Sequence, residues 1–185
     1  MLVTVITPTT IDRERFNERI RSIVALQDYP HIEHLFDYDD GNIGTKRNRL
    51  CERANGGIIV HLDSDDIYAP DWVSRSVSAL MASGKQVVGL SAFYLSDGSK
   101  TWKYTYPHDE NIVGGTFCYY KSYWDRRRFL SMQVGEDNEF VRGVDFGVHG
   151  YIDGFLATIH AGNTSPKAVE ACERYEEVEK VTIAI

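Results

Sequence analysis

The sequence has few of the features that mark secreted, membrane-spanning or metal-cysteine proteins. Its three cysteines, Cys51, Cys118 and Cys172, are odd in number and lack the spacing of a metal site, so we expect reduced, mostly buried thiols. No apolar run approaches the ~20 residues that a transmembrane helix needs. The first residues also lack the charged region of a signal peptide. These absences predict a cytoplasmic protein without a membrane span.

Positive charge is also scarce. The chain carries 20 Lys and Arg against 27 Asp and Glu, which gives a net charge of −7 at pH 7. This balance argues against a general nucleic-acid-binding surface, although it leaves a local basic patch open. Hydrophobic residues make up 43% and charged residues 25% of the 185 residues, as in an ordinary globular protein, and the length is most simply one domain.

The most informative stretch is a short apolar run that ends in three carboxylates. Residues 58–62 are bounded by glycine and predict a buried strand, and Asp63, Asp65 and Asp66 follow it directly. Because like charges this close repel one another, a cation is expected among them, and a hard divalent ion prefers oxygen ligands. The alternative is an acidic surface turn that caps the next helix.

The first part of the chain alternates strands and helices. Compact apolar runs predict strands at 2–7, 31–38 and 58–62, and residues at helical spacing predict helices at 12–29, with Asp12 as its cap, and at 45–54. The order strand, helix, strand, helix, strand predicts an α/β fold whose central sheet is mostly parallel with right-handed crossovers.

The pattern after the acidic run is less regular. A helix at 70–84 and a strand at 86–95 lead into a hairpin with an aromatic strand at 101–106. The remaining expected elements are a strand at 116–120, a helix at 123–129, a helix from 135 through Arg142, a strand at 155–160, a charged helix from Ser165-Pro166 to about Lys180, and an edge strand or packed tail at 181–185.

A second acidic cluster ends the second predicted strand. Asp37, Asp39 and Asp40 should share a crevice with Asp63, because parallel strands place their carboxyl ends along one edge of a sheet.

Three basic residues, Lys46, Arg47 and Arg49, lie between the two acidic clusters at the start of a helix. Cations next to a metal-binding carboxylate cluster suit a phosphorylated ligand. The alternative is a solvated helix face.

Several segments, in this order and spacing, resemble GT-A glycosyltransferases, most closely the inverting family 2. They are Val3–Thr9, Asp39–Gly41, Lys46–Arg49, His61–Asp66 and Ala69–Asp71, and Gly135–Asp137 with Phe140 and Arg142 resembles the family's second signature. The resemblance implies a GT-A, Rossmann-like sheet flanked by helices, with a small antiparallel hairpin region on the acceptor side. Residues 1–96 would form the nucleotide-sugar-binding half and residues 97–185 the acceptor-binding half of a single domain.

The resemblance also implies site residues. Those expected at the nucleotide sugar are Thr7, Pro8, Thr9, Asp37, Asp39, Asp40, Lys46, Arg47, Asp63, Ser64 and Asp65. Within this set, Asp39 or Asp40 would bind the base, with Asp37 as a less favoured substitute. Mn²⁺ or Mg²⁺ on the diphosphate would be held by Asp65, with Asp63, Asp66 and His160 as further candidates.

The expected general base is Asp137, with Glu136 orienting it or contacting the acceptor. The alternative for this pair is an acidic cap at a helix N-terminus. A lone histidine is more often structural than functional, which is the alternative for His160, and His61 is expected to be a packed core residue.

Together these expectations describe a metal-dependent inverting glycosyltransferase that moves a sugar from a nucleoside-diphosphate sugar, with a UDP-sugar favoured, to an acceptor hydroxyl. The acceptor class stays open between a saccharide, a lipid-linked sugar, a protein and a hydroxylated nucleobase, and so does the oligomeric state, a homodimer included. The alternatives are a nucleotidyltransferase on a related fold, which should carry a glycine- and arginine-rich signature in place of Thr9-Thr10-Ile11, and a non-catalytic nucleotide-sugar-binding module.

Overall fold

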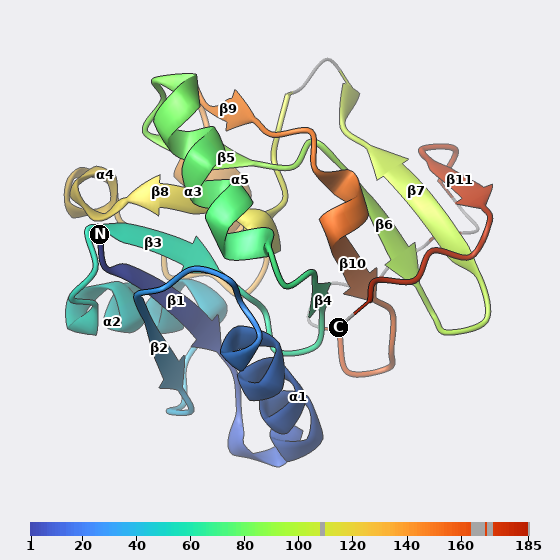
Figure 1. The fold of residues 1–185 in the computed structure, drawn as a ribbon, viewed down its shortest axis with the longest axis horizontal. Helices are drawn as coiled ribbons and strands as arrows, with labels where there is room; N and C mark the ends of the chain where they lie inside the picture. Colours follow the sequence, from blue (N-terminus) through green and yellow to red (C-terminus); the bar gives the residue numbers. More distant parts are fainter. Residues whose placement is uncertain (108–109, 164–168, 170–171, 185) are drawn as a thin grey trace.

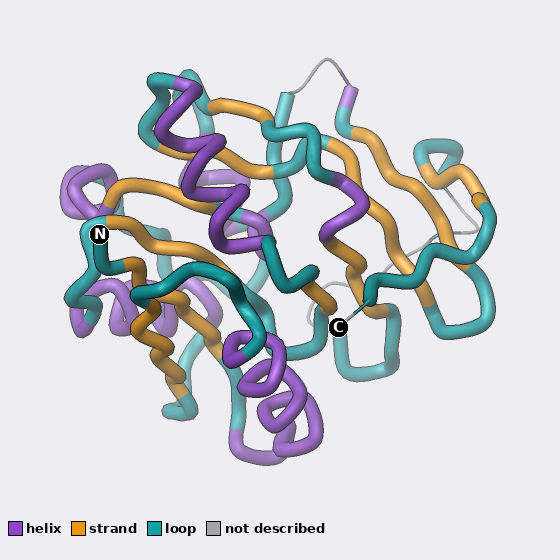
Figure 2. The backbone as a smooth tube through the Cα atoms, viewed as in Figure 1, coloured by secondary structure: helices purple, strands orange, loops and turns teal. Residues whose placement is uncertain are grey.

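The computed structural model of the chain describes residues 1–107, 110–163, 169 and 172–184. These residues form two β-sheets, and the helices pack mainly around the first of them (Figures 1 and 2). The first sheet has the strand order β2-β1-β3-β8-β5-β9, and the second has the order β11-β7-β6-β10-β4.

The first sheet carries the alternating pattern of the N-terminal part. Strand β1 (Val3–Pro8) lies between β2 (Ile32–Asp37) and β3 (Ile58–His61), and both neighbours run parallel to it. The connections are the 3₁₀ turn η1 (Ile11–Arg13) with helix α1 (Glu14–Ala25), and helix α2 (Ile43–Arg53). The carboxyl ends of these strands therefore lie along one edge, where open α/β sheets bind their ligands.

The other half of the first sheet mixes directions. Strand β8 (Cys118–Tyr120) runs antiparallel to both β3 and β5 (Val87–Gly89), and β9 (Gly147–Val148) runs parallel to β5. The short turn η3 (Gly114–Thr116) precedes β8, and helices α4 (Lys121–Arg126) and α5 (Glu136–Val141) follow it. This order brings η3 and α5 back to the edge at which β1 and β3 end.

Side chains alternate along β1 and β3 and build two hydrophobic cores. Val5 and Val60 pack with α1 and with α3 (Trp72–Ser83), whereas Ile6 and Ile59 pack with α2, α4 and α5. A period of two with both faces apolar is the pattern of a strand covered on each side by helices. The first sheet is therefore the middle layer of an α/β/α sandwich.

The second sheet is built on the predicted hairpin. Strands β6 (Ala92–Ser96) and β7 (Thr101–Thr105) pair antiparallel, as the sequence predicts. Strand β10 (Phe155–Thr158), which follows the 3₁₀ turn η4 (Ile152–Gly154), runs parallel to β6, and β4 (Ile67–Tyr68) pairs with β10. Through β4 the chain just after the acidic run joins this second sheet.

Two predicted elements are wrong. The strand at 86–95 divides at Leu90 and Ser91 into β5 of the first sheet and β6 of the second, because the chain crosses there between the sheets. Strand β11 (Tyr175–Val178) replaces part of the charged helix predicted to end near Lys180, since pairing with β7 outweighs local helix propensity. The predicted cap at 165–166 lies outside the described residues.

Some helix boundaries also differ from the prediction. Helix α1 ends at Ala25, well before the predicted end at 29, and Asp12 lies inside η1 and does not cap α1. Helix α4 begins and ends earlier than the predicted 123–129. Helix α2 begins at an unpredicted cap, Asn42, whose side chain accepts a hydrogen bond from the Thr45 amide at 3.0 Å.

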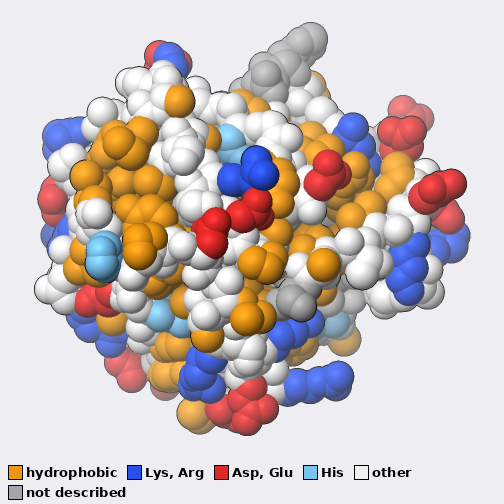
Figure 3. Space-filling view, viewed as in Figure 1, with side chains coloured by type: hydrophobic (Ala, Val, Ile, Leu, Met, Phe, Trp, Pro, Cys, Tyr) orange, Lys and Arg blue, Asp and Glu red, His pale blue; other side chains and the backbone are white. Residues whose placement is uncertain are grey.

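On the face seen in Figure 3, basic and acidic side chains are interspersed with hydrophobic ones. Within the described part of the chain, no helix is both long enough and apolar enough to cross a bilayer.

Candidate active site

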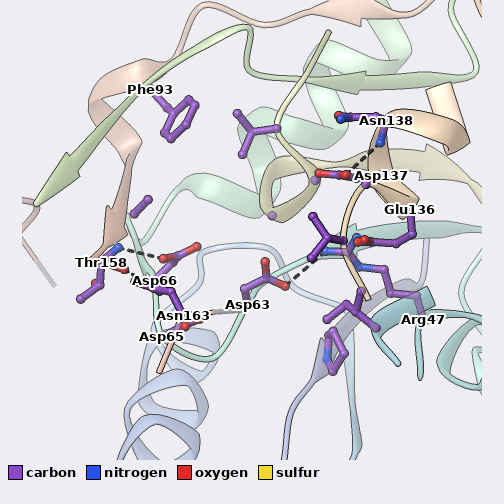
Figure 4. Close-up of a pocket in the computed structure, with 18 of the residues that line it drawn as sticks. Arg47, Asp63, Asp65, Asp66, Phe93, Glu136, Asp137, Asn138, Thr158 and Asn163 are labelled. Carbon is purple, nitrogen blue, oxygen red and sulfur yellow. Dashed lines mark hydrogen bonds and ion pairs between the residues drawn. The ribbon is translucent and has the colours of Figure 1, made fainter. Parts of the chain in front are cut away.

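The carboxyl ends of β1 and β3 open into a pocket of about 280 Å³ (Figure 4). Five carboxylates line it: Asp63, Asp65, Asp66, Glu136 and Asp137. The second sheet and its connections contribute an apolar side, with Phe93, Tyr106 and Phe155. Two predicted groups that lie far apart in the sequence, the acidic run and the Glu136-Asp137 pair, therefore meet in one pocket, and the interpretation of the acidic run as a surface turn is wrong.

Asp63 lies between the two groups of carboxylates (Figure 4). Its amide donates a hydrogen bond to the Tyr68 hydroxyl at 2.8 Å. Its Oδ1 is buried without a hydrogen-bond partner, at 3.7 Å from Arg47 Nη2. Burial raises the pKa of Asp63, Arg47 lowers it, and the charge of Asp65 raises it again. A buried carboxylate oxygen without a donor, beside other carboxylates, is a suitable ligand for a cation.

Asp65 is held by two side chains from distant parts of the chain. Its Oδ2 accepts a hydrogen bond from Arg13 Nη2 at 3.0 Å and lies 2.9 Å from His160 Nε2. The His160 ring stacks on Phe16, with centroids 4.8 Å apart. His160 therefore reaches the acidic loop, as its predicted role requires, and Arg13 balances the charge of Asp65.

Arg47 connects the two acidic groups. Its guanidinium donates a hydrogen bond to Glu136 Oε1 and faces Asp63, and its side chain is only 4% exposed. Burial raises the pKa of Glu136, and the charge of Arg47 opposes this shift. Lys46 is also buried, and its ammonium donates to the carbonyl of Thr9. The interpretation of Lys46 and Arg47 as a solvated helix face is therefore wrong.

Two consecutive glycines separate Asp63 from Asp137. A Cβ atom on Gly114 would lie 2.6 Å from Asp137 Oδ2, and a Cβ atom on Gly115 would lie 2.9 Å from Asp63 Oδ2. The same position on Gly115 is 3.5 Å from Asp66 Oδ2, and Asp66 Oδ1 accepts a hydrogen bond from the Thr158 amide at 2.9 Å. Only a residue without a side chain leaves the space between these carboxylates open.

Of the remaining residues predicted for the nucleotide, Pro8 lines the pocket, whereas Thr7, Thr9 and Ser64 do not. Thr7 Oγ1 donates to the Leu62 carbonyl at 2.8 Å, and Thr9 Oγ1 donates to Asn17 Oδ1 at 2.7 Å and lies 3.3 Å from Ser64 Oγ. These bonds fasten the end of β1 to α1 and to the acidic loop.

The second acidic cluster divides into a buried and an exposed part. Asp37 is buried and accepts two hydrogen bonds from Arg49, at 2.6 and 3.0 Å, whereas Asp39 and Asp40 are exposed. Arg49 also donates to the carbonyls of Asp39 and Asp40. Asp37 is therefore paired with Arg49 inside the protein, whereas the carboxylates of Asp39 and Asp40 lie at the surface.

Several residues of the pocket are not predicted from the sequence, among them Arg13, Gly114, Gly115 and Asn138. The glycine pair precedes the predicted strand at 116–120, but its contact with Asp137 depends on how α5 folds back. Arg13 carries no local sign of its function, since its partner Asp65 is 52 positions away.

The residues at the acidic loop fit a hard divalent cation that is shared with a ligand. Among the described residues, no group of three or more His, Cys, Asp or Glu side chains could hold a metal ion by itself. Mg²⁺ and similar ions are commonly bound by one or two carboxylates together with substrate phosphates and water. The unpartnered Oδ1 of Asp63 and the neighbouring carboxylates supply such a set.

The chain resembles known proteins in sequence and in fold. Residues 18–141 match the sequence model of glycosyl transferase family 2. Staphylococcus aureus TarS in complex with UDP-GlcNAc superposes with a TM-score of 0.69 at 15% identity, over 89% of this chain and 60% of that one. Mannosyltransferase PcManGT from Pyrobaculum calidifontis, in complex with GDP-Man and Mn²⁺, superposes with a TM-score of 0.60 at 14% identity, over 85% of this chain and 56% of that one. No curated protein matches the chain.

The fold is therefore the GT-A-type α/β fold that the sequence predicts, and the chain spans 56–60% of the length of these two solved structures. Because the family match covers more than half of the residues, this chain belongs to glycosyl transferase family 2.

Proposed function

We propose that this chain is a metal-dependent, inverting glycosyltransferase that takes a sugar from a nucleoside-diphosphate sugar. The observation that supports this best is the placement of Asp63 and Asp137 on opposite sides of the Gly114-Gly115 turn, in one pocket. Carboxylates on one side suit a metal-bound diphosphate, and a carboxylate on the other side suits a proton acceptor. Residues 1–96 would bind the donor and residues 97–185 the acceptor.

The proposed role of the metal ion follows from the chemistry of the diphosphate leaving group. Breaking the bond between the sugar and the diphosphate leaves negative charge on the phosphate oxygens, and a bound Mn²⁺ or Mg²⁺ stabilises that charge as a Lewis acid. Asp65 and Asp63 would hold the ion, with Asp66 and His160 as further candidates. TarS is bound to UDP-GlcNAc and PcManGT to GDP-Man, so UDP-sugars and GDP-sugars are the first donors to test.

The acceptor side depends on Asp137. A carboxylate on the far side of the sugar from the leaving group removes the proton of the attacking hydroxyl, and attack from that side inverts the anomeric carbon. Glu136, which is paired with Arg47, would orient the start of α5 and with it Asp137. The acceptor would be a saccharide, a lipid-linked sugar or another hydroxyl compound such as a hydroxylated nucleobase.

The experiment is a turnover assay on a panel of UDP- and GDP-sugars with Mn²⁺ or Mg²⁺, with release of the nucleoside diphosphate as the readout. We expect metal-dependent release with at least one donor, and a loss of about 100-fold or more in the Asp137→Asn variant. Asp125→Asn is the matched control, because Asp125 is an exposed aspartate of α4 and not a pocket residue. Nucleotide binding without release, unchanged by Asp137→Asn, would instead indicate a non-catalytic binding module.

A further inference from the structure

A chain of buried hydrogen bonds lies directly behind the wall of the pocket. Cys51 Sγ lies 3.2 Å from the Tyr119 hydroxyl, and that hydroxyl lies 3.0 Å from His61 Nε2. His61 Nδ1 lies 2.7 Å from the carbonyl oxygen of Gly114. The side chains belong to α2, β8 and β3, and the chain of bonds ends on the glycine turn of the pocket.

The direction of each hydrogen bond follows from chemistry. A carbonyl oxygen only accepts, so His61 Nδ1 must carry a proton and donate it to Gly114. The Tyr119 hydroxyl, in contrast, can donate as well as accept. Nε2 then accepts from the Tyr119 hydroxyl, and the hydroxyl oxygen accepts from the Cys51 thiol.

The residues packed around His61 hold its ring in place. The side chains of Cys51, His61 and Tyr119 are fully buried. The imidazole ring also packs against Phe117 at 5.5 Å and Phe129 at 5.7 Å between ring centroids. His61 is therefore the packed core residue that the sequence predicts, and this prediction is confirmed.

The neighbouring carbonyl is held in the same way. The Tyr68 hydroxyl donates to the carbonyl of Gly115 at 3.0 Å and accepts from the amide of Asp63 at 2.8 Å. Two buried side chains, His61 and Tyr68, therefore fix two successive peptide carbonyls of the turn that separates Asp63 from Asp137. The Gly114 carbonyl also accepts a long hydrogen bond from the Phe117 amide, at 3.4 Å, so the 2.7 Å bond to His61 is the shorter of its two.

We propose that His61, supported by Tyr119 and Cys51, is a positioning residue that sets where Gly114 lies and, through it, where the carboxylate of Asp137 lies relative to Asp63. The inference depends on the proposed function, because it concerns the distance between the metal-diphosphate side and the base side. If the hydrogen bond from His61 to the Gly114 carbonyl is lost, the glycine turn relaxes. Asp137 is then misplaced, while the carboxylates of the acidic loop stay in position.

Two substitutions of His61 distinguish a role in positioning the turn from a role in stability alone. His61→Leu fills the volume without a donor, whereas His61→Asn places an amide N–H near the former Nδ1. We expect His61→Leu to lower kcat by about 10- to 100-fold, the size of effect that a misplacement of about 1 Å can cause, with little change in the KM for the donor. We expect His61→Asn to recover at least a tenth of the wild-type kcat. Cys118→Ala is the matched control, since Cys118 is a fully buried residue on the opposite face of the same sheet.

A second measurement does not depend on activity. The ¹⁵N spectrum of the imidazole should show the Nδ1–H tautomer of His61, and the ¹³C signal of the Asp137 carboxyl should shift in His61→Leu but not in Cys118→Ala. An Nε2–H tautomer, an unmoved Asp137 signal, or a His61→Leu variant with wild-type kcat would overturn the inference. A wild-type protein that transfers no sugar would overturn the proposed function instead, and the two spectra would then decide the positioning claim alone.

Discussion

Arg47 and Glu136 form an ion pair whose side chains are only 4% and 6% exposed. The pair joins α2 to the first residue of α5, the helix that carries the candidate base Asp137. Glu136 therefore has a buried partner in the first turn of α5. The same guanidinium faces Asp63, so one residue contacts both sides of the pocket.

Removal of one partner of this pair should be costly. We expect Arg47→Met to lower the free energy of unfolding by about 3–5 kcal/mol, because Glu136 is left buried without a counter-charge. The double variant Arg47→Met with Glu136→Leu should recover a large part of this loss. The measurement is urea denaturation of both variants, and equal stability of Arg47→Met and wild type would show that Glu136 finds another partner.

Substitutions of the two glycines should affect different kinetic constants, because each glycine faces a different carboxylate of the pocket. Gly114→Ala places a methyl group 2.6 Å from Asp137 Oδ2, so we expect kcat to fall by about 100-fold with donor affinity nearly unchanged. Gly115→Ala meets Asp63 Oδ2 at 2.9 Å, so we expect the affinity for the metal-bound nucleotide to fall first. Steady-state kinetics and calorimetry on both variants test this, and identical effects of the two would contradict it.

Helix α2 should tolerate no side chain at Gly44. A Cβ atom there would lie 1.9 Å from the Leu130 carbonyl oxygen, whereas a Cβ atom on Gly57 meets nothing within 4 Å. We expect Gly44→Ala to destabilise the protein by about 1–3 kcal/mol through overpacking, and Gly57→Ala to have little effect. Thermal unfolding of the two variants is the check, and a neutral Gly44→Ala would mean that the loop carrying Leu130 moves freely.

The ion pair between Arg13 and Asp65 should compete with a metal ion. We expect Arg13→Gln to raise the affinity for Mn²⁺ alone by about 2- to 5-fold, the range expected for a partly exposed pair of ~0.5–1 kcal/mol. Electron paramagnetic resonance of free Mn²⁺ measures this directly. Arg21→Gln is the control, since Arg21 pairs with Glu14 at the surface, and a similar effect of both variants would mean that only net charge matters.

His149 should make stability depend on pH. Burial lowers its pKa to about 4, and both ring nitrogens lack hydrogen-bond partners. The unfolded chain binds a proton near pH 6.5 and the folded chain only near pH 4, so stability should be complete above pH 6.5 and fall between these values, by about 1.4 kcal/mol per pH unit at most. Denaturation from pH 8 to pH 4 should show a shallower fall in His149→Leu, and parallel curves would rule out this role.

The prediction from sequence succeeded where local pattern decides the structure. The alternation of β1, α1, β2, α2 and β3 follows from apolar periodicity. The acidic run directly follows the apolar run of β3, and it lies at the sheet edge where the parallel strands end. The β6–β7 hairpin followed from its turn residues.

The prediction failed where contacts between residues far apart in the sequence determine the structure. An apolar run such as 86–95 does not reveal that the chain changes sheets inside it, and the pairing of β11 with β7 has no signature within 175–178. Lys46 and Arg47 look alike in sequence, yet one bonds the Thr9 carbonyl and the other joins the two acidic groups. The contact of Gly114 with Asp137 depends on the fold of α5 and was likewise invisible.

The central claim is that the carboxylates after β3 hold a metal ion on a diphosphate. Calorimetric titration of UDP and GDP into the protein, with Mn²⁺ and then with EDTA, tests it most directly, together with Asp65→Asn. We predict that at least one nucleotide binds with Mn²⁺, that binding falls by at least 10-fold in EDTA, and that Asp65→Asn weakens the metal-dependent part. Equal affinity with and without metal, or no binding of either nucleotide, would contradict the claim.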